Sequence, residues 1–159
     1  MQIKLYLQTA VFVFLLIIIF WWGEAGGGIE STVQVLLISI FLSSAAFFIK
    51  KKLIYKLATY GVLVSLLMCA YQAGQASMGR AFNHCVEHGE DVRVDLQKYF
   101  EVHHRYPNVL AELDNKTCDR ILRPSILSYL PVNQGYQLYF GDSFVSFTAN
   151  ESQPFEAHK

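Results

Sequence analysis

The sequence changes character just after residues 53–71, which read LIYKLATYGVLVSLLMCAY. This stretch is apolar apart from Lys56, which lies within one turn of its start and can extend its amine to a membrane surface. Over the whole chain 53% of the 159 residues are hydrophobic and 16% are charged, a balance too apolar for an ordinary soluble domain. Most charged residues follow residue 73, so the composition predicts one part of the chain in lipid and the other in water.

Two other apolar segments precede this one, at residues 5–22 and 33–49. Each is close to the roughly 20 residues that an α-helix needs to cross a bilayer. The sequence therefore predicts a transmembrane region, residues 1–73, with three helices at about 5–22, 33–49 and 53–71. No Asp, Glu, Arg or His lies in the middle of these segments, which argues against a pathway for protons or ions. Membrane lipid is the first predicted partner.

The positions of the lysines predict the orientation. Four lysines between residues 50 and 56 mark the connection between the second and third segments as cytoplasmic, because Lys and Arg resist translocation. The connection 23–32 has two Glu and no Lys or Arg, so it is expected outside. This predicts a bacterial inner-membrane protein with a cytoplasmic N-terminus and a periplasmic domain at residues 74–150. The alternative, cleavage of residues 1–25 as a signal peptide, would leave that domain on the same side.

Cysteine positions agree with an outer compartment. Cys85 and Cys118 both fall in the expected periplasmic part, where thiols tend to be oxidised. A disulfide between them would close a loop of about 34 residues and contribute roughly 3 to 4 kcal/mol. We predict this disulfide, with two separately buried thiols as the alternative. Cys69 lies inside the third apolar segment, where a packing role is expected.

The outer domain begins with a helical pattern at residues 75–104, where apolar side chains recur at spacings of three and four. The helix is expected to end before Pro107, and a short helix to follow at residues 109–113. It either continues the third apolar segment as one rod or breaks at Gly74 or Gly79. Gly89 is a weak point at which the helix is expected to kink.

The C-terminal part predicts strands. Residues 136–140 and 143–147 alternate apolar and polar side chains about Gly141-Asp142, which is typical of a β-hairpin. An isolated hairpin is marginally stable, so it must pack on the amphipathic helix. The predicted fold class is thus membrane α plus small α+β: three transmembrane helices and a long helix on a small antiparallel sheet. Residues 151–159 are expected to form a flexible tail.

Two segments carry a family resemblance. Residues 96–113 read LQKYFEVHHRYPNVLAEL, a helix that ends at an Arg-Tyr-Pro turn before a short Leu-containing helix, and residues 135–140 read GYQLYF, a strand. Over about residues 53–149 the chain resembles the type IV pilin and type II secretion pseudopilin superfamily. The resemblance implies a pilin-like outer domain. The third apolar segment lacks the family's leader and nearby Glu, and two segments precede it, which implies a retained membrane protein and not a filament subunit.

Few residues suggest catalysis. His84 and His88 have the spacing that can hold a metal, but Cys85 is needed for the disulfide and no His-Glu-x-x-His pattern exists. Glu87, Asp91 and the nearby Asp95 form an acidic stripe expected on a solvated helix face. After residue 73 eight Lys and Arg stand against eleven Asp and Glu, so no nucleic acid is expected. No catalytic residue, cofactor or metal ligand is predicted, and the protein is not expected to be an enzyme.

Two surfaces are predicted to meet partners. The aromatic residues of the hairpin exceed what one sheet face can bury on a helix, so some are expected to contact another protein, the alternative being that all are core. These residues are Tyr136, Tyr139, Phe140, Phe144 and Phe147. A small-residue face that includes Ser39, Ser43 and Ala46 suits association of helices in the membrane.

Two functions compete at this point. The first is a non-enzymatic inner-membrane protein whose periplasmic pilin-like domain binds another envelope protein, as an accessory factor of a type IV pilus or secretion system. The second is a membrane-anchored immunity protein that neutralises a toxin at the periplasmic side. A small membrane enzyme using His84 and His88 ranks last.

Overall fold

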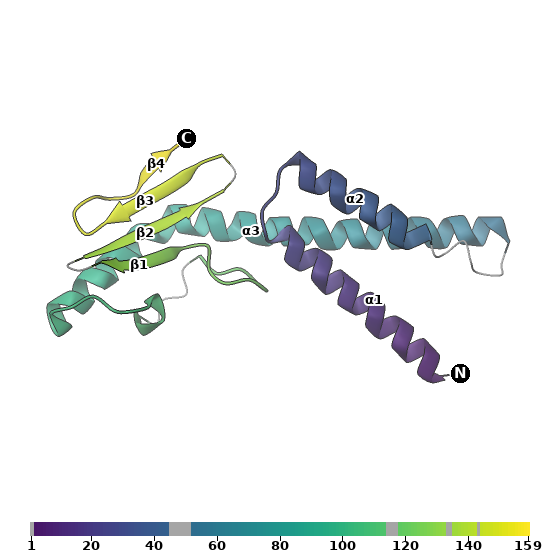
Figure 1. Cartoon of the computed structure of the whole chain (residues 1–159), viewed down its shortest axis with the longest axis horizontal. Coiled ribbons are helices and arrows are strands. Elements are labelled where there is room, and N and C mark those ends of the chain that lie inside the picture. Colours follow the sequence, from purple (N-terminus) through teal and green to yellow (C-terminus); the bar gives the residue numbers. More distant parts are fainter. Residues whose placement is uncertain (1, 45–51, 114–117, 133–134, 143) are drawn as a thin grey trace. The chain divides into compact units, whose positions relative to one another are not determined.

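The computed structural model describes residues 2–44, 52–113, 118–132, 135–142 and 144–159. The chain divides into two compact units, Met1–Ala76 and Ser77–Lys159. Its elements are α1 (Gln2–Gly23), α2 (Ile29–Ser43), α3 (Leu53–His103), the 3-10 helix η2 (Leu110–Leu113), β1 (Ser128–Val132), β2 (Gly135–Gly141), β3 (Ser146–Asn150) and β4 (Glu156–His158) (Figure 1).

The helix α3 is the one helix among the described residues that is long and apolar enough to cross a membrane. The apolar parts of the other two helices, Thr9–Gly23 and Ile29–Ser43, are shorter. At about 1.5 Å per residue, a helix of 15 residues spans roughly 22 Å, less than the roughly 30 Å of a hydrocarbon layer. Of the three predicted spans the structure therefore supports the third; residues 45–49, predicted to end the second, lie outside the described part.

The three helices of Met1–Ala76 share one small core. Buried Ile19 of α1 and Val35 of α2 cluster with Leu67 and Tyr71 of α3. Ser39 and Ser43 are buried as well, at four-residue spacing from Val35 along the same helix. The predicted small-residue face thus packs inside the chain, except for Ala46, which lies outside the described residues.

Two glycines bring α1 and α3 into close contact. A Cβ added to Gly23 would lie 3.0 Å from the Cα of Gly74 and would meet the carbonyl oxygen of Tyr71. A Cβ on Gly74 would in turn meet the carbonyl oxygen of Phe20. Small residues let helix backbones approach in this way. Gly74, which the sequence offered as a possible helix break, is instead a contact point within a continuous α3.

Polar side chains close the connection between α1 and α2. The hydroxyls of Ser31 and Tyr71 are hydrogen-bonded at 2.9 Å. The Gln75 amide donates to the Tyr71 hydroxyl at 3.1 Å and to the carbonyl oxygen of Gly27 at 3.2 Å. These bonds satisfy polar groups at the end of the apolar core and tie the glycine-rich connection to α3.

The second unit is a helix on a small antiparallel sheet, as predicted. Its four strands follow the order β1-β2-β3-β4, and each pair is antiparallel. The sheet lies along one side of the C-terminal part of α3 (Figure 1). Their shared core contains Cys85, Val92, Leu96, Cys118, Leu127, Tyr136, Leu138, Phe140 and Ala149.

The hairpin differs from its prediction by three residues. The second strand was expected at residues 143–147, but β3 begins at Ser146. The carboxylate of Asp142 accepts hydrogen bonds from the backbone N–H groups of Phe144 at 2.7 Å and Val145 at 2.8 Å. An Asp side chain that bonds its own backbone in this way stabilises a wider turn. Phe144 therefore lies in the turn and not in the strand.

Residues 151–159, expected to form a flexible tail, include regular structure. Glu156–His158 forms β4, and Phe155 packs against the core. The backbone N–H of Phe155 donates to the carboxylate of Glu90 at 2.8 Å, while Arg93 donates to the carbonyl oxygen of Asn150 at 3.1 Å. We name residues 151–155 the strap, because they connect β3 to β4 and contact α3 through Phe155.

Gly89 explains how the strap fits. A Cβ at this position would lie 2.9 Å from a ring carbon of Phe155. Gly89 does not interrupt the helix, since α3 runs unbroken from Leu53 to His103. The glycine leaves room for an aromatic ring on the helix surface.

The turn after α3 is held by one carboxylate. Glu112 accepts hydrogen bonds from the backbone N–H groups of Asn108 at 3.0 Å and Val109 at 3.3 Å, and from the Tyr99 hydroxyl at 2.8 Å. The bond from Tyr99 lowers the pKa of the Glu112 carboxyl. The predicted short helix at 109–113 is present as the 3-10 helix Leu110–Leu113.

The predicted disulfide is confirmed. Cys85 and Cys118 are bonded, with a Cα–Cα distance of 5.0 Å, and both are buried. The bond joins α3 to the segment that precedes β1. It therefore fixes a stretch that has little regular structure of its own.

We expect Cys85→Ser to lower the free energy of unfolding of the full chain by about 3 to 4 kcal/mol, because the unfolded chain regains the entropy of an open loop. Urea titration in detergent micelles, followed by circular dichroism, measures the loss. Cys69→Ser is the matched control, because Cys69 is a free thiol in the described part of the chain. Equal stability of the two variants would contradict a structural disulfide.

A pair of glycines tests the strap. A Cβ at Gly79 meets no atom within 4 Å, so Gly79→Ala should gain the helix preference of Ala, about 1 kcal/mol. Gly89→Ala gains the same preference but crowds Phe155, and we expect it to be less stable than Gly79→Ala by about 1 kcal/mol or more. The same urea titration gives both values. Faster proteolysis within residues 151–159 of Gly89→Ala would accompany the loss, and equal gains would show that the ring does not pack there.

Candidate functional site

Of the five aromatic residues proposed as partner contacts, the structure buries some and leaves others exposed. Tyr136 and Phe140 are buried in the core, and Phe147 is partly buried with its ring stacked on that of Phe140 at 4.8 Å. Tyr139 is 49% exposed and Phe144 is 78% exposed. Alternate residues of a strand point to opposite faces, so Tyr139 lies on the sheet face directed away from the core. Tyr139 and Phe144 are the aromatic side chains of this set that are open to a partner.

The strand register places Tyr139 in a row of mostly polar residues. Tyr139 pairs with Ser128 of β1 on one side and with Thr148 of β3 on the other, and Thr148 pairs with Glu156 of β4. The next row of this face contains Leu130, Gln137 and Asn150. The outward face therefore combines one exposed aromatic ring with hydroxyl, amide and carboxylate groups. We call it the outer face.

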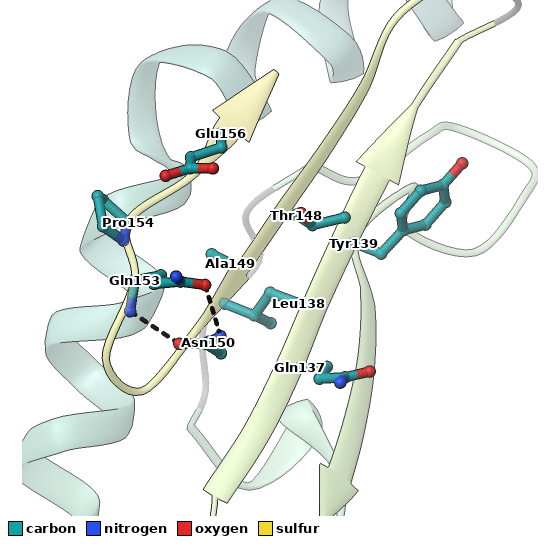
Figure 2. Close-up of a pocket in the computed structure, with 9 residues that line it drawn as sticks. All are labelled: Gln137, Leu138, Tyr139, Thr148, Ala149, Asn150, Gln153, Pro154 and Glu156. Atoms are coloured by element: carbon teal, nitrogen blue, oxygen red, sulfur yellow. Dashed lines mark hydrogen bonds between the residues drawn. The ribbon is translucent and has the colours of Figure 1, made fainter. Parts of the chain in front are cut away.

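A shallow groove of about 430 Å³ crosses the outer face (Figure 2). Tyr139 and Thr148 lie along its β2 and β3 side, while Pro154 and Glu156 form its other rim (Figure 2). Its remaining lining residues are Gln137, Leu138, Ala149, Asn150 and Gln153. Most of the polar groups are neutral, so the groove is suited to hydrogen bonding with a neutral or weakly charged partner.

The rim of the groove is fixed by a network around Asn150. The side-chain oxygen of Asn150 accepts from the backbone N–H groups of Gln153 at 2.7 Å and Ser152 at 2.9 Å. Its amide nitrogen donates to the side-chain oxygen of Gln153 at 3.2 Å (Figure 2). Asn side chains commonly stabilise turns by such local bonds. The strap, which sequence reasoning missed, thus supplies one wall of the groove; the Pro154-Phe155 pair was its sequence signal.

A second groove of about 570 Å³ lies at the C-terminal end of α3. Phe100 stacks on Tyr106 at 4.8 Å, and Arg105 and His104 add cationic or titratable groups to the lining. His104 has a φ of 53°, a left-handed conformation that ends the helix. This groove borders residues 133–134, which the structure does not describe, and we base no function on it.

Buried tyrosines support the sheet from within. The Tyr129 hydroxyl donates to the carbonyl oxygen of Pro107 at 2.6 Å, and burial raises the pKa of Tyr129 to about 12. Burial also raises the pKa of Tyr136, whose ring meets that of Tyr106 edge-on at 5.0 Å. The raised pKa values follow from burial, because the Tyr136 ring belongs to the shared core and the Tyr129 ring packs against it.

The histidine pair lies on the surface of α3. The rings of His84 and His88 are 4.6 Å apart, and Nδ1 of His88 lies 3.2 Å from the Asp91 carboxylate. The described parts of the chain bring no three His, Cys, Asp or Glu side chains together as a metal site. Two imidazoles on an open helix face provide neither a cleft nor a nucleophile for a reaction.

Protein-family models, curated proteins and solved structures were all compared with the chain, and none matches it. The assignment of function therefore depends on the geometry of this chain.

The raised pKa of Tyr129 predicts how stability depends on pH. The folded state keeps the proton of Tyr129 up to about pH 12, whereas the unfolded state releases it near 10, so stability should fall as the pH rises through this window. Tyr129→Phe should lose about 0.5 to 1.5 kcal/mol at neutral pH with its hydrogen bond, and should show a shallower decline above pH 10. Urea titrations at several pH values measure both effects. Parallel declines in the two proteins would contradict the burial of this hydroxyl.

Proposed function

We propose that the chain is a non-enzymatic bacterial inner-membrane protein whose unit Ser77–Lys159 is a periplasmic, pilin-like domain that binds another envelope protein. The proposed partner is a component of a type IV pilus or secretion system, to which this protein is accessory. The observation that carries the proposal is the outer face, where the exposed Tyr139 lies along one side of a groove lined by hydrogen-bonding groups. The partner would lie along β2 and β3.

The chemistry of the outer face favours a protein partner. Tyrosine is enriched at protein interfaces because its ring offers a large contact area while its hydroxyl forms hydrogen bonds. The neighbouring groups are mostly neutral amides and hydroxyls, which pair well with peptide backbone and side chains. Phe144, in the turn between β2 and β3, would extend the contact beyond the groove.

The exposed apolar surface of α3 supports membrane anchoring. Only 6% of the residues in its most apolar stretch are buried by the rest of the chain. The core helix of a water-soluble protein would be largely covered, because exposed apolar surface in water is costly. Lipid is the medium that covers such a helix.

The resemblance to pilins and the packing of Met1–Ala76 together favour a retained protein. A pilin-like subunit leaves the bilayer when it enters a filament, but here α1 and α3 meet at backbone contact through Gly23 and Gly74. Extraction of α3 would break this contact and the polar bonds of Tyr71. We therefore propose an accessory role and not that of a filament subunit.

Reporter fusions test the proposed topology. Alkaline phosphatase fused after Lys159 should be active, because the enzyme folds only where disulfides form outside the cytoplasm. The same enzyme fused after Lys52 should be inactive, since the connection before α3 is expected to be cytoplasmic. Activities in the reverse order would place Ser77–Lys159 in the cytoplasm and end the proposal.

Site-specific crosslinking tests the interaction. A photoreactive phenylalanine at Tyr139 of the full chain, in intact cells, should form a covalent adduct with a pilus or secretion component. Val94 of α3 is the matched control, because its exposure of 51% is close to the 49% of Tyr139 while it lies on the helix. We expect little or no adduct from the control position.

The identity of the adduct decides between functions. A pilus or secretion protein captured at Tyr139 but not at Val94 supports the accessory role. A toxin captured there would replace it with the immunity function. Adducts only with cytoplasmic proteins, or equal adducts from both positions, would contradict an interaction through the outer face.

A further inference from the structure

The segment between Cys118 and β1 carries an exposed apolar pair. Ile121 is 64% exposed and Leu122 is 46% exposed. An arginine flanks the pair on each side, at Arg120 and Arg123. We name residues 118–127 the arginine loop. Two adjacent aliphatic side chains between cations are the pattern of a segment that enters a membrane interface.

The arginine loop has a defined structure. The Arg120 guanidinium donates to the carbonyl oxygen of Pro124 at 2.8 Å, and the backbone N–H of Ile126 donates to the carbonyl oxygen of Cys118 at 3.1 Å. The disulfide to Cys85 anchors the first residue of the loop to α3. The loop therefore presents its apolar tip in a fixed conformation, which lowers the entropy lost on binding.

One hydrogen bond shows where the tip of the loop, Ile121 and Leu122, lies along α3. The backbone N–H of Ile121 donates to the hydroxyl of the buried Ser77 at 3.4 Å. Arg80 follows three residues later on the same helix and is exposed. The tip is thus attached to α3 within one turn of Arg80.

That position coincides with the end of the uncharged part of α3. Between Lys56 and Arg80 the chain has no Asp, Glu, Lys, Arg or His. The 23 intervening residues span roughly 35 Å as a helix, slightly more than the roughly 30 Å of a hydrocarbon layer. If Lys56 lies at one surface of the bilayer, Arg80 lies at the other. Ser77 and the attached tip then lie at the same depth as the lipid headgroups.

The charges match the phosphates of lipids. Arg80, Arg120 and Arg123 are positive, and Asp119 is the acidic residue of the loop. Arginine pairs with phosphate through a planar fork of N–H groups and tolerates partial desolvation better than lysine. A cationic rim around an apolar tip complements a layer of phosphates above acyl chains.

From this placement we propose that the arginine loop docks on the outer surface of the membrane. Ile121 and Leu122 enter the boundary between headgroups and acyl chains, and Arg80, Arg120 and Arg123 contact anionic phosphates. The proposal depends on α3 crossing the membrane, as proposed above, but not on any partner of the outer face. It adds a second, surface attachment to the domain beyond the span itself.

Quenching of tryptophan fluorescence tests the docking in the full chain. The protein, with Trp21→Phe and Trp22→Phe to remove native tryptophans, is reconstituted in vesicles of phosphatidylcholine and phosphatidylglycerol that carry a spin label near the headgroup. In this background Leu122→Trp should show a blue-shifted emission that the spin label quenches. Val109→Trp is the matched control, because Val109 is an exposed aliphatic residue of the same unit that follows the C-terminal end of α3 at His103, far in sequence from Ser77. Its emission should not be quenched.

A third position separates failure of the docking from failure of the span. Leu63→Trp reports insertion of α3, and a spin label placed deep in the acyl chains should quench it. Quenching at Leu63→Trp without quenching at Leu122→Trp would overturn the docking while the span stands. No quenching at either position would overturn both. If Leu122→Trp does not fold with the Cys85–Cys118 disulfide formed, Ile121→Trp provides a second reporter at the same tip.

The charge requirement is tested by lipid composition. Quenching of Leu122→Trp should decrease when phosphatidylglycerol is omitted, and Arg120→Gln with Arg123→Gln should cause a similar decrease in the mixed vesicles. Quenching that depends on neither change would overturn the role of the arginines. The crosslinking at Tyr139 does not depend on these results, so the docking of the arginine loop and the interaction through the outer face can fail separately.

Discussion

The structure depends on one constraint: α3 must provide the packing partner for both units of the chain. Leu67 and Tyr71 hold α1 and α2, while Cys85, Val92 and Leu96 hold the sheet. The apolar face of the four-stranded sheet is covered by α3, which removes that surface from water. The two short apolar helices likewise bury few side chains except against α3. A substitution at one of these positions of α3 therefore disturbs the packing of the elements beside it within the same unit.

Periodicity predicted the parts of the fold that depend on local pattern. The apolar positions of residues 75–104 included Cys85, Val92 and Leu96, which are buried, and the alternation of residues 136–140 predicted a strand, although Tyr136 and Phe140, both named as candidate partner contacts, are buried in it. The disulfide followed from the expected compartment and the number of cysteines. Each of these inferences uses residues close in sequence, or a chemical property that does not require a three-dimensional arrangement. Of the three predicted spans the structure supports the third, because hydropathy reports composition and not the length of a helix.

The missed features depend on contacts between distant residues. The strap is held by the packing of Phe155 on Gly89 and by its hydrogen bond to Glu90, 65 residues earlier, and the local sequence of residues 151–159 does not identify these partners. The shift of β3 follows from one carboxylate, Asp142, that accepts two backbone bonds. The candidate site likewise has a part that follows from local pattern and a part that depends on distant contacts. Alternation separates Tyr139 from Phe140, but the groove beside Tyr139 needs the strap as its wall, so its shape was not predictable from the hairpin alone.

The two proposals give different tasks to the outer face and the arginine loop of Ser77–Lys159. Tyr139 lies among neutral amides and hydroxyls, which form moderate hydrogen bonds and suit a partner that binds and leaves. Ile121 and Leu122 lie among arginines, whose attraction to a charged surface acts over a longer distance and is weakened by salt. A domain held by both α3 and a loop would lose rotational freedom at the membrane before it meets a protein. Because ordering costs free energy on binding, such prior restraint would strengthen a modest contact through the outer face without enlarging it.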